Sequence, residues 1–421
     1  MQTTAGFETA QSIVRADGRS QWLAPVASVP ALGWETARLV TGKPPETPQS
    51  DLSISTSTME NEHLRVAINP DGQISSVWDK HKRRELLKPG ETANRLTVYE
   101  DKPLDWEAWD VDWFFEQKSW SVGGPESLEV VETGPHRVAL RICYRYQNST
   151  IVQVMSLARN SAIVEFDTHV DWNENQSLLK AEFPFDLNCT NVRSEIQFGH
   201  VSRPTTKNTS WEQARFEASM HRWLDMSERD FGAAILNDCK YGYDADEQRI
   251  RITLIKSGIW PYPGADIGAH DFRYGLVVHH GVDAVQQVPE LAEAFSNPLT
   301  VIGDRSVGEG AGDFTPTKFG LVRSDQPNVS VQSIKKCEDS DLIIVRLCEE
   351  MNTRTLANIA FSIPVESAHQ VDLLERNAEP LEVHDGNTIA VQMRPFEILT
   401  LQIKPDTISS NNHGARGQRM N

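Results

Sequence analysis

The chain has 421 residues, 39% of them hydrophobic, and a formal net charge of −18 at pH 7. At roughly 150 residues per domain, this length predicts two to three globular domains with sizeable cores. The negative charge, with no cluster of Lys and Arg, argues against nucleic acid and anionic membrane surfaces as partners. Five cysteines lie far apart without a CxxC pair, which argues against a disulfide framework or a zinc ribbon.

The first thirty residues contain no apolar run of signal-peptide length, and no later stretch approaches the length of a membrane span. We therefore expect a cytoplasmic protein, or one that enters an organelle without a signal peptide of the secretory type.

Residues 1–50 are expected to be a remnant of a preceding linker or β region. Within them, 21–40 predicts one or two strands around a proline bend, and the following stretch to residue 58 has the Pro, Ser and Thr composition of a linker. A domain boundary is therefore expected near residue 50.

Residues 51–302 are filled by short alternating apolar runs. The stretch 63–79 predicts a hairpin that turns at Asp71-Gly72. Further strands are expected in five runs that alternate or are rich in β-branched and aromatic residues: 137–146, 151–158, 162–172, 249–257 and 272–280. No window of comparable length shows a helical apolar stripe, so the region is predicted to be all-β.

Residues 303–330 are expected to connect this domain to a second one, because glycine and charged residues replace the alternation over 303–316. A C-terminal β-sandwich is predicted for 331–405, with a turn at Asp385-Gly386. Its strands are expected at 329–337, 341–350, 356–363, 370–377, 388–394 and 397–404. The tail 406–421 has nothing to bury and is expected to be disordered.

Residues 105–115, DWEAWDVDWFF, place three tryptophans and three aspartates within eleven positions. Tryptophan faces stack on pyranose rings, and carboxylates serve as acids, bases and nucleophiles. The stretch therefore fits a sugar-binding cleft, and it equally fits a crowded edge of a β-sandwich.

One predicted strand carries four potential metal ligands on one face: Glu165, Asp167, His169 and Asp171. Side chains two positions apart on a strand project about 7 Å from each other, which is close enough to hold one ion. Such a row is more often a solvated sheet face. We therefore assign no metal site and no catalytic set to it.

Two loops carry further candidate binding residues, since loops can be shaped without disturbing a core. The stretch 236–248 follows an apolar strand, and 256–272 is a Pro/Gly loop too long for a simple connection. In the polar segment 197–223, four side chains either contact a ligand or pin loops together: His200, Arg203, His221 and Arg222. No GxSxG, HExxH or glycine-rich phosphate motif occurs, which argues against serine hydrolases, zincins and nucleotide-binding proteins.

Several of these segments together resemble a known family. In order between about Leu23 and Pro405 occur DWEAWDVDWFF, EFPFDLN, EIQFGHVSRPTTKNTSWEQARFE, LNDCKYGYD, DFRYGLVVHHG and VDLLERN…RPFEILTLQIKP. This series resembles the C-terminal half of the glycoside hydrolase family 38 α-mannosidases, and within them it is most similar to the cytosolic and fungal-vacuolar branch. The run from FGHVSRPT to LNDCKYGYD is the most specific part.

The resemblance implies a large, mutarotase-like β-supersandwich over 51–302, followed by the small C-terminal β-sandwich. It also implies a retaining, zinc-dependent α-mannosidase of oligosaccharide catabolism, whose zinc and Asp nucleophile lie in an N-terminal α/β barrel. The sequence has no counterpart of the family's HxHxD-like zinc motif, nor of its His-containing segment ending in PGS. Zinc is therefore expected in the full-length family and no cofactor in this chain.

The same resemblance implies an α-mannoside or oligosaccharide substrate, a catalytic barrel as partner domain or partner chain, and a cytoplasmic or vacuolar location. A homo-oligomer stays an open alternative. Relatives usually have Arg-Ser-Pro where this chain has Lys256-Ser257-Gly258, which keeps a positive charge but loses the bidentate guanidinium.

The loops of the β domains are expected at the rim of the active site. The residues expected to line the cleft or contact substrate are Trp106, Trp109, Asp110, Asp112, Asp238, Lys240, Tyr241, Tyr243, Lys256, Asp266 and His270. An exposed apolar patch is expected at Trp106, Trp109, Trp113 and Phe114.

Two other functions stay open. A stand-alone carbohydrate-binding or assembly module would use the aromatic residues at 106–115 and 260–262 as a platform and would show no turnover. A mutarotase-like sugar enzyme would need a histidine acid and a carboxylate base in a groove, for which His200, His270 and Glu212 are the candidates.

Overall fold

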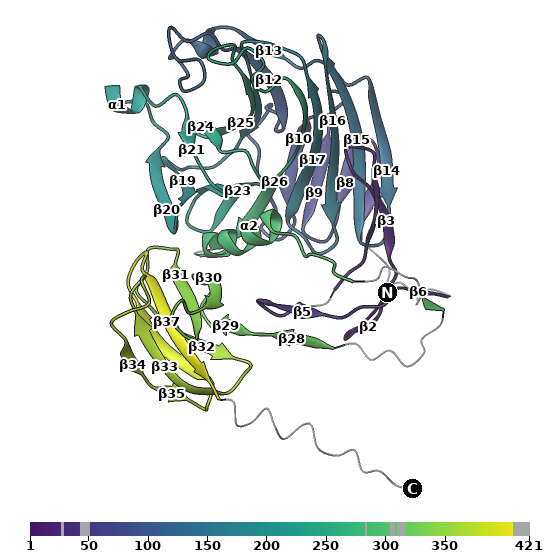
Figure 1. The fold of residues 1–421 in the computed structure, drawn as a ribbon. Coiled ribbons are helices and arrows are strands. Elements are labelled where there is room, and N and C mark those ends of the chain that lie inside the picture. The colour runs from purple at the N-terminus through teal and green to yellow at the C-terminus, as the bar shows by residue number, and fades with distance from the viewer. Residues whose placement is uncertain (27–28, 43–50, 283, 304–307, 310–316, 407–421) are drawn as a thin grey trace.

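The computed structural model describes residues 1–26, 29–42, 51–282, 284–303, 308–309 and 317–406. Over these residues the protein is all-β, with a large β-supersandwich followed by a small C-terminal β-sandwich (Figure 1). Residues 43–50 of the expected linker and 407–421 of the expected tail lie outside the described residues. No helix in the described ranges is long and apolar enough to cross a membrane.

A nine-stranded antiparallel sheet forms one layer of the supersandwich. In spatial order its strands are β14 (Ser127–Thr133), β15 (Arg137–Tyr146), β16 (Ser149–Ala158), β17 (Ile163–Trp172), β26 (Gly268–His280), β23 (Phe231–Asn237), β22 (Trp223–Ser227), β19 (Asn191–Ile196) and β20 (Gly199–Pro204). Four strands expected from the sequence, at 137–146, 151–158, 162–172 and 272–280, are confirmed here as β15, β16, β17 and β26. The fifth, at 249–257, is confirmed as a strand of the six-stranded sheet. On β17 the alternation places Val164, Phe166, Thr168, Val170 and Trp172 on the buried face.

Two smaller sheets pack against the nine-stranded sheet. The six-stranded sheet runs β13 (Ser119–Ser121), β12 (Arg95–Glu100), β18 (Ser177–Pro184), β25 (Arg249–Ser257), β24 (Gly242–Asp246) and β21 (Ala218–Ser219). The five-stranded sheet runs β11 (Arg84–Glu85), β10 (Ile74–Asp79), β9 (Leu64–Ile68), β8 (Thr58–Glu60) and β7 (Ser53–Ile54). Side chains of all three sheets share one continuous apolar core. The expected β9–β10 hairpin is confirmed, with Gly72 at φ 75°.

Two helices and two 3₁₀ turns accompany the supersandwich: α1 (Ser210–Gln213), α2 (Val288–Ser296), η1 (Phe115–Gln117) and η2 (Ala284–Gln287). The expectation that no apolar stripe of helical period occurs in this region is wrong for α2, in which Val288, Leu291, Ala292 and Phe295 follow the i, i+3, i+4, i+7 spacing. Its Val288, Ala292 and Phe295 pack on outward-facing side chains of β22, β23 and β26. Because α2 covers this face, β23 is buried along its whole length and reads as a continuous apolar run instead of an alternating one.

The C-terminal sandwich has two sheets around its own core. One contains β29 (Val322–Ser324), β32 (Thr355–Phe361), β36 (Thr388–Met393) and β35 (Val383–His384). The other contains β30 (Val329–Lys336), β31 (Ile343–Glu349), β37 (Ile398–Pro405), β33 (Val365–Val371) and β34 (Glu379–Leu381). The strand expected at 370–377 is wrong, because β33 ends at Val371. Asp372 then accepts backbone hydrogen bonds from Leu374 and Arg376 at 2.9 Å each and closes a turn.

The N-terminal residues form β1 (Gln2–Thr3), β2 (Gly6–Phe7), β3 (Gln11–Val14), β4 (Ser20–Leu23), β5 (Gly33–Glu35) and β6 (Val40–Thr41). The β3–β4 hairpin lies on the nine-stranded sheet, where Ala16 packs with Ala139 and Val154. Strand β5 pairs with β28 (Lys318–Gly320), and β6 pairs with β27 (Gly308–Glu309). The chain that links the two sandwiches is therefore paired with the N-terminal segment.

The two sandwiches touch through β20 and the C-terminal domain. The Nδ1 atom of His200 lies 3.0 Å from the carbonyl oxygen of Glu350, and the His200 ring packs against Phe396 with centroids 5.3 Å apart. Gly199, at φ 148°, lies so close to Phe396 that a Cβ there would be 2.5 Å from its ring.

Candidate functional site

Three exposed tryptophans gather where two loops of the supersandwich meet. Trp106 and Trp109 come from the loop between β12 and β13, and Trp260 comes from the loop between β25 and β26. Their ring centroids lie 5.5–5.9 Å apart in edge-to-face pairs. They are 59%, 68% and 50% exposed, respectively. We call these three residues the tryptophan cluster.

Glu107 ties the two loops of the tryptophan cluster together. Its carboxylate accepts hydrogen bonds from the backbone N–H of Ile259 at 2.6 Å and of Trp260 at 3.2 Å, and from Gln176 Nε2 at 2.8 Å. The hydrogen bond from Ile259 is the main cause that lowers the pKa of Glu107. The ionised carboxylate therefore fixes Trp260 beside Trp106.

The two aspartates expected at the rim shape their own loop. Asp112 accepts hydrogen bonds from the backbone N–H of Leu104 at 3.2 Å and of Trp113 at 2.9 Å, and Asp110 accepts one from Val111 at 2.9 Å. Both are partners of backbone groups, as is usual for aspartate in turns.

Lys256 stands at the base of the same region and forms an ion pair with Asp101. Asp101 is buried, and this burial raises the pKa of its carboxyl group despite the nearby positive charge of Lys256. The ammonium group is thus held by a carboxylate of the protein.

The other expected rim residues make separate sets of contacts. Asp238 accepts a hydrogen bond from the backbone N–H of Arg273 at 3.0 Å, and Lys240 Nζ lies 4.5 Å from the ring centroid of Phe272. Tyr241 is exposed beside His221, whereas the ring of Tyr243 lies in the main core.

In the loop before β26, the Nε2 atom of His270 lies 2.9 Å from the carbonyl oxygen of Asp266. The structure therefore brings Trp106 and Trp109 together with Trp260, whereas Asp238, Lys240 and Tyr241 contact other partners.

The row on β17 is partly covered by the N-terminal hairpin. Asp167 pairs with Arg15 at 2.9 Å and accepts the backbone N–H of Ala16, while His169 Nδ1 lies 2.8 Å from Asp271. Across the part of the chain that the structure describes, no three His, Cys, Asp or Glu side chains gather as metal ligands.

A cavity of about 460 Å³ lies beside the same β12–β13 loop. Its wall includes Trp113, Phe216 and helix α1, and its charged lining is Glu116, Lys207, Arg215, Asp244 and Arg251. None of these five charged residues is among the expected site residues. The sequence did hold a signal for two of them, because Asp244 and Asp246 face Arg251 and Arg249 across the tight β24–β25 hairpin.

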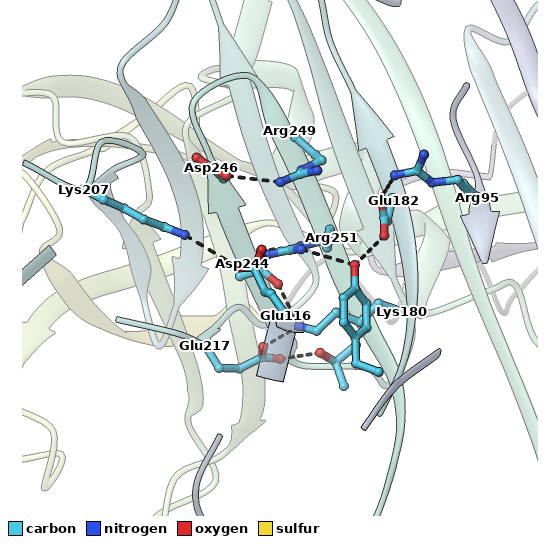
Figure 2. A network of polar contacts seen from close by, with 12 residues as sticks. Arg95, Glu116, Lys180, Glu182, Lys207, Glu217, Asp244, Asp246, Arg249 and Arg251 are labelled. Carbon is cyan, nitrogen blue, oxygen red and sulfur yellow. Dashed lines mark hydrogen bonds and ion pairs between the residues drawn. The ribbon is translucent and has the colours of Figure 1, made fainter. Parts of the chain in front are cut away.

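Glu116, Asp244 and Arg251 form the floor of this cavity and belong to a network of charged side chains (Figure 2). Asp244 lies 2.6 Å from Arg251 and 2.8 Å from Lys180, whose Nζ also lies 2.5 Å from Glu217. Arg251 Nη2 donates to Glu116 at 2.8 Å. Strands β18, β24 and β25 of the six-stranded sheet supply the three most deeply buried members, Lys180, Asp244 and Arg251.

Mutual neutralisation keeps Lys180 and Asp244 charged despite their burial, whereas burial raises the pKa of Glu217. Burial alone would lower the pKa of Lys180, but Asp244 and Glu217 outweigh it and raise that pKa. Burial alone would raise the pKa of Asp244, and Lys180 and Arg251 outweigh it in turn. The same balance lowers the pKa of Glu116, because the hydrogen bond from Arg251 overcomes desolvation. At neutral pH Asp244 and Glu116 therefore line the cavity as carboxylates.

Comparison with known proteins gives matches along both sandwiches. Residues 59–264 match the family described as Glycosyl hydrolases family 38 C-terminal domain, and residues 328–401 match the Glycosyl hydrolases family 38 C-terminal beta sandwich domain. The crystal structure of an alpha-mannosidase from Enterococcus faecalis V583 is similar in fold, with a TM-score of 0.66 at 15% identity, over 94% of this chain and 51% of that one.

Two curated relatives are similar in sequence. Alpha-mannosidase G of Dictyostelium discoideum is 33% identical over 354 residues, which cover 82% of this chain and 32% of the relative. Alpha-mannosidase 2C1 of Homo sapiens is 32% identical over 388 residues, which cover 89% of this chain and 37% of the relative. This chain spans about a third of the length of these relatives. Because both of its sandwiches match the C-terminal domains of the same family, the chain belongs to glycosyl hydrolase family 38.

Proposed function

We propose that the chain is the C-terminal portion of a retaining, zinc-dependent α-mannosidase that hydrolyses terminal α-mannosides in oligosaccharide catabolism when joined to a catalytic barrel. The observation that carries this proposal is the tryptophan cluster within the family-matched residues 59–264. Its exposed aromatic surface, fixed by Glu107, suits a cleft wall or a packing surface for the barrel. The proposed location is the cytoplasm or the vacuole.

The proposed division of labour follows from the chemistry of glycoside hydrolysis. A retaining glycosidase needs a carboxylate nucleophile and an acid/base carboxyl about 5–5.5 Å apart. The aspartates at 110 and 112 hold backbone N–H groups of their own loop. Zinc needs several converging His, Cys or carboxylate ligands, and the residues that the structure describes do not offer such a set. In this proposal the bond-breaking groups and the zinc ligands belong to the barrel.

A second candidate is a stand-alone carbohydrate-binding or assembly module. The exposure of the tryptophan cluster favours it, because exposed tryptophan rings are a platform for the apolar face of a sugar. A mutarotase-like activity has less support. His200 contacts Glu350 and Phe396, His270 contacts Asp266, and Glu212 closes the capping box of α1, so each candidate has its own separate partners.

The test is hydrolysis of a chromogenic α-mannoside. The 421-residue chain would be assayed alone, with zinc and with cobalt, and again after fusion to the catalytic barrel of a family relative. Turnover by the fusion but not by the chain alone, together with at least a tenfold loss of kcat/KM in a Trp106→Ala fusion, supports the proposal. Chelator-sensitive turnover by the chain alone would contradict the proposed division of labour. Sugar binding with an inactive fusion would favour the stand-alone module.

A further inference from the structure

Three charged groups of the cavity keep hydrogen-bonding capacity that the protein does not use. Glu116 binds Arg251 through Oε1, and its Oε2 atom has no hydrogen bond to any residue that the structure describes. Lys207 Nζ lies 3.7 Å from Glu116 Oε1, which is beyond hydrogen-bond distance. The guanidinium of Arg215 has neither an ion pair nor a hydrogen bond within the described ranges. The cavity thus presents one strong acceptor beside two sets of donors.

An aromatic wall stands beside these polar groups. Trp113 lines the cavity and is 63% exposed, so part of its indole surface is open to a ligand. Phe216 lines it as well and is anchored in a small apolar cluster with Tyr99, Phe115 and Leu178. An open aromatic ring next to fixed donors and acceptors suits a molecule with one apolar face and a polar rim.

The floor of the cavity is held in place before any ligand arrives. Arg251 is fixed by Asp244 at 2.6 Å and by Glu116 at 2.8 Å, and its guanidinium lies over the Phe115 ring at 5.5 Å. Because Glu116 is oriented by this buried arginine, little side-chain entropy is lost when its second oxygen accepts a hydrogen bond. The volume of about 460 Å³ falls within the range of small-molecule sites, which is about 300–1,000 Å³.

Charge distinguishes between ligand classes. The lining contains three cationic and two anionic side chains, and the whole chain carries −18. The charges of the lining nearly cancel, and the negative charge of the whole chain repels anions. Both features favour a neutral polyhydroxylated ligand over a phosphate or a carboxylate. A pair of adjacent hydroxyls can donate one hydrogen bond to Glu116 and accept others from Lys207 and Arg215.

We propose that this cavity is a binding site for one neutral pyranose residue, which lies against Trp113 while two adjacent hydroxyls engage Glu116, Lys207 and Arg215. This site is separate from the tryptophan cluster and needs no barrel. It goes beyond the proposed function, because it places a sugar in a cavity to which neither the mannosidase proposal nor the stand-alone module assigns a ligand.

The experiment is direct binding of methyl α-D-mannopyranoside to the 421-residue chain, measured by saturation-transfer difference NMR and titration. Two variants remove cavity groups, Trp113→Ala and Arg215→Ala. The matched control removes an exposed tryptophan elsewhere, Trp22→Ala in the N-terminal hairpin, and Trp109→Ala tests the tryptophan cluster as the alternative sugar site. The unfolding midpoint of each variant verifies that it is folded, and inorganic phosphate serves as the competing anion.

We expect saturable binding by the wild-type chain, affinity at least about tenfold weaker in both cavity variants, and affinity within about twofold of wild type in Trp22→Ala. Absence of binding, or wild-type affinity in both cavity variants, would overturn the proposal. Loss of binding in Trp109→Ala alone would place the sugar on the tryptophan cluster instead. Phosphate binding without mannoside binding would make the cavity an anion site. Because no turnover is measured, these outcomes are independent of the proposed hydrolysis.

Discussion

Replacing Asp244 by Asn tests whether the buried charge network stabilises the supersandwich. Asp244 bridges Arg251 at 2.6 Å and Lys180 at 2.8 Å, and both cations have side chains no more than 3% exposed. Removing its charge leaves two buried cations with one carboxylate each, Glu116 and Glu217. Breaking a buried ion pair from one side costs about 3–5 kcal/mol, so we expect the free energy of unfolding to fall by about that amount.

The same strand supplies a matched control. Asp246 faces Arg249 at 3.1 Å, but both side chains are about 30% exposed. Asp246→Asn removes the same charge two residues further along β24, where a solvated pair contributes about 0–1 kcal/mol. The two substitutions differ mainly in burial, so their difference measures what burial adds.

Urea unfolding followed by tryptophan fluorescence is the assay. All eleven tryptophans precede residue 261, so the signal reports on the supersandwich and the N-terminal segment and not on the C-terminal sandwich. The pKa of Asp244 is lowered in the folded protein, so its contribution is complete above its unfolded pKa of about 3.9. The gap between wild type and Asp244→Asn should stay constant from pH 7 to 5 and shrink as the pH falls below 4. Equal stabilities of the two variants, within about 0.5 kcal/mol, would refute the reasoning.

Three further predictions concern the loops, the core and the interface. Glu107→Ala should speed amide hydrogen exchange at Ile259 and Trp260. Since the pKa of Glu107 is lowered, the protection of the same amides in the wild type, taken relative to the intrinsic exchange rate at each pH, should decrease as the pH falls below about 4.3, and unchanged protection would contradict the anchoring role. Phe166→Ala should lower the free energy of unfolding by about 3–5 kcal/mol, because the ring is fully buried and stacks on Tyr274 at 4.8 Å, whereas Phe7→Ala, at an exposed position, should change it by less than about 1 kcal/mol. Gly199→Ala should loosen the contact between the two sandwiches, seen as faster proteolysis, because its Cβ would lie 2.5 Å from the Phe396 ring and a φ of 148° is strained for alanine; unchanged proteolysis would argue against this clash.

The parts of the fold that the sequence predicted depend on local patterns. The alternation along β17 and the Asp-Gly turns at 71–72 and 385–386 are each encoded within ten residues. Asp385 and Gly386 both have positive φ, at 51° and 75°, as such a turn requires. The apolar stripe of α2 was missed because the helix is only nine residues long, so its helical period is visible over little more than two turns.

The site could be predicted only in part, for a physical reason. The aromatic character of loop 101–118 is visible in the sequence, but its contact with Trp260 spans about 150 residues of chain and depends on how β12, β18 and β25 align. The buried charge network around Asp244 is even harder to predict from the sequence. Lys180 lies in an apolar strand 64 residues from Asp244, and only the six-stranded sheet brings the two together.

The pairing of β5 with β28 and of β6 with β27 has a practical consequence for anyone shortening the chain. Residues 1–41 look dispensable in the sequence, but Arg15 forms an ion pair with Asp167 and the Ala16 N–H donates a hydrogen bond to the same carboxylate. Strands β5 and β6 also pair with β28 and β27, which lie in the segment between the sandwiches. A fragment beginning at residue 51 would leave the Asp167 carboxylate without Arg15 and Ala16 as partners. It would also leave β27 and β28 without their paired strands, and unpaired strand edges favour aggregation. Shortened versions of the chain for biophysical work should therefore retain the N-terminal hairpins, and a fusion partner is better attached ahead of Met1 than in place of these residues.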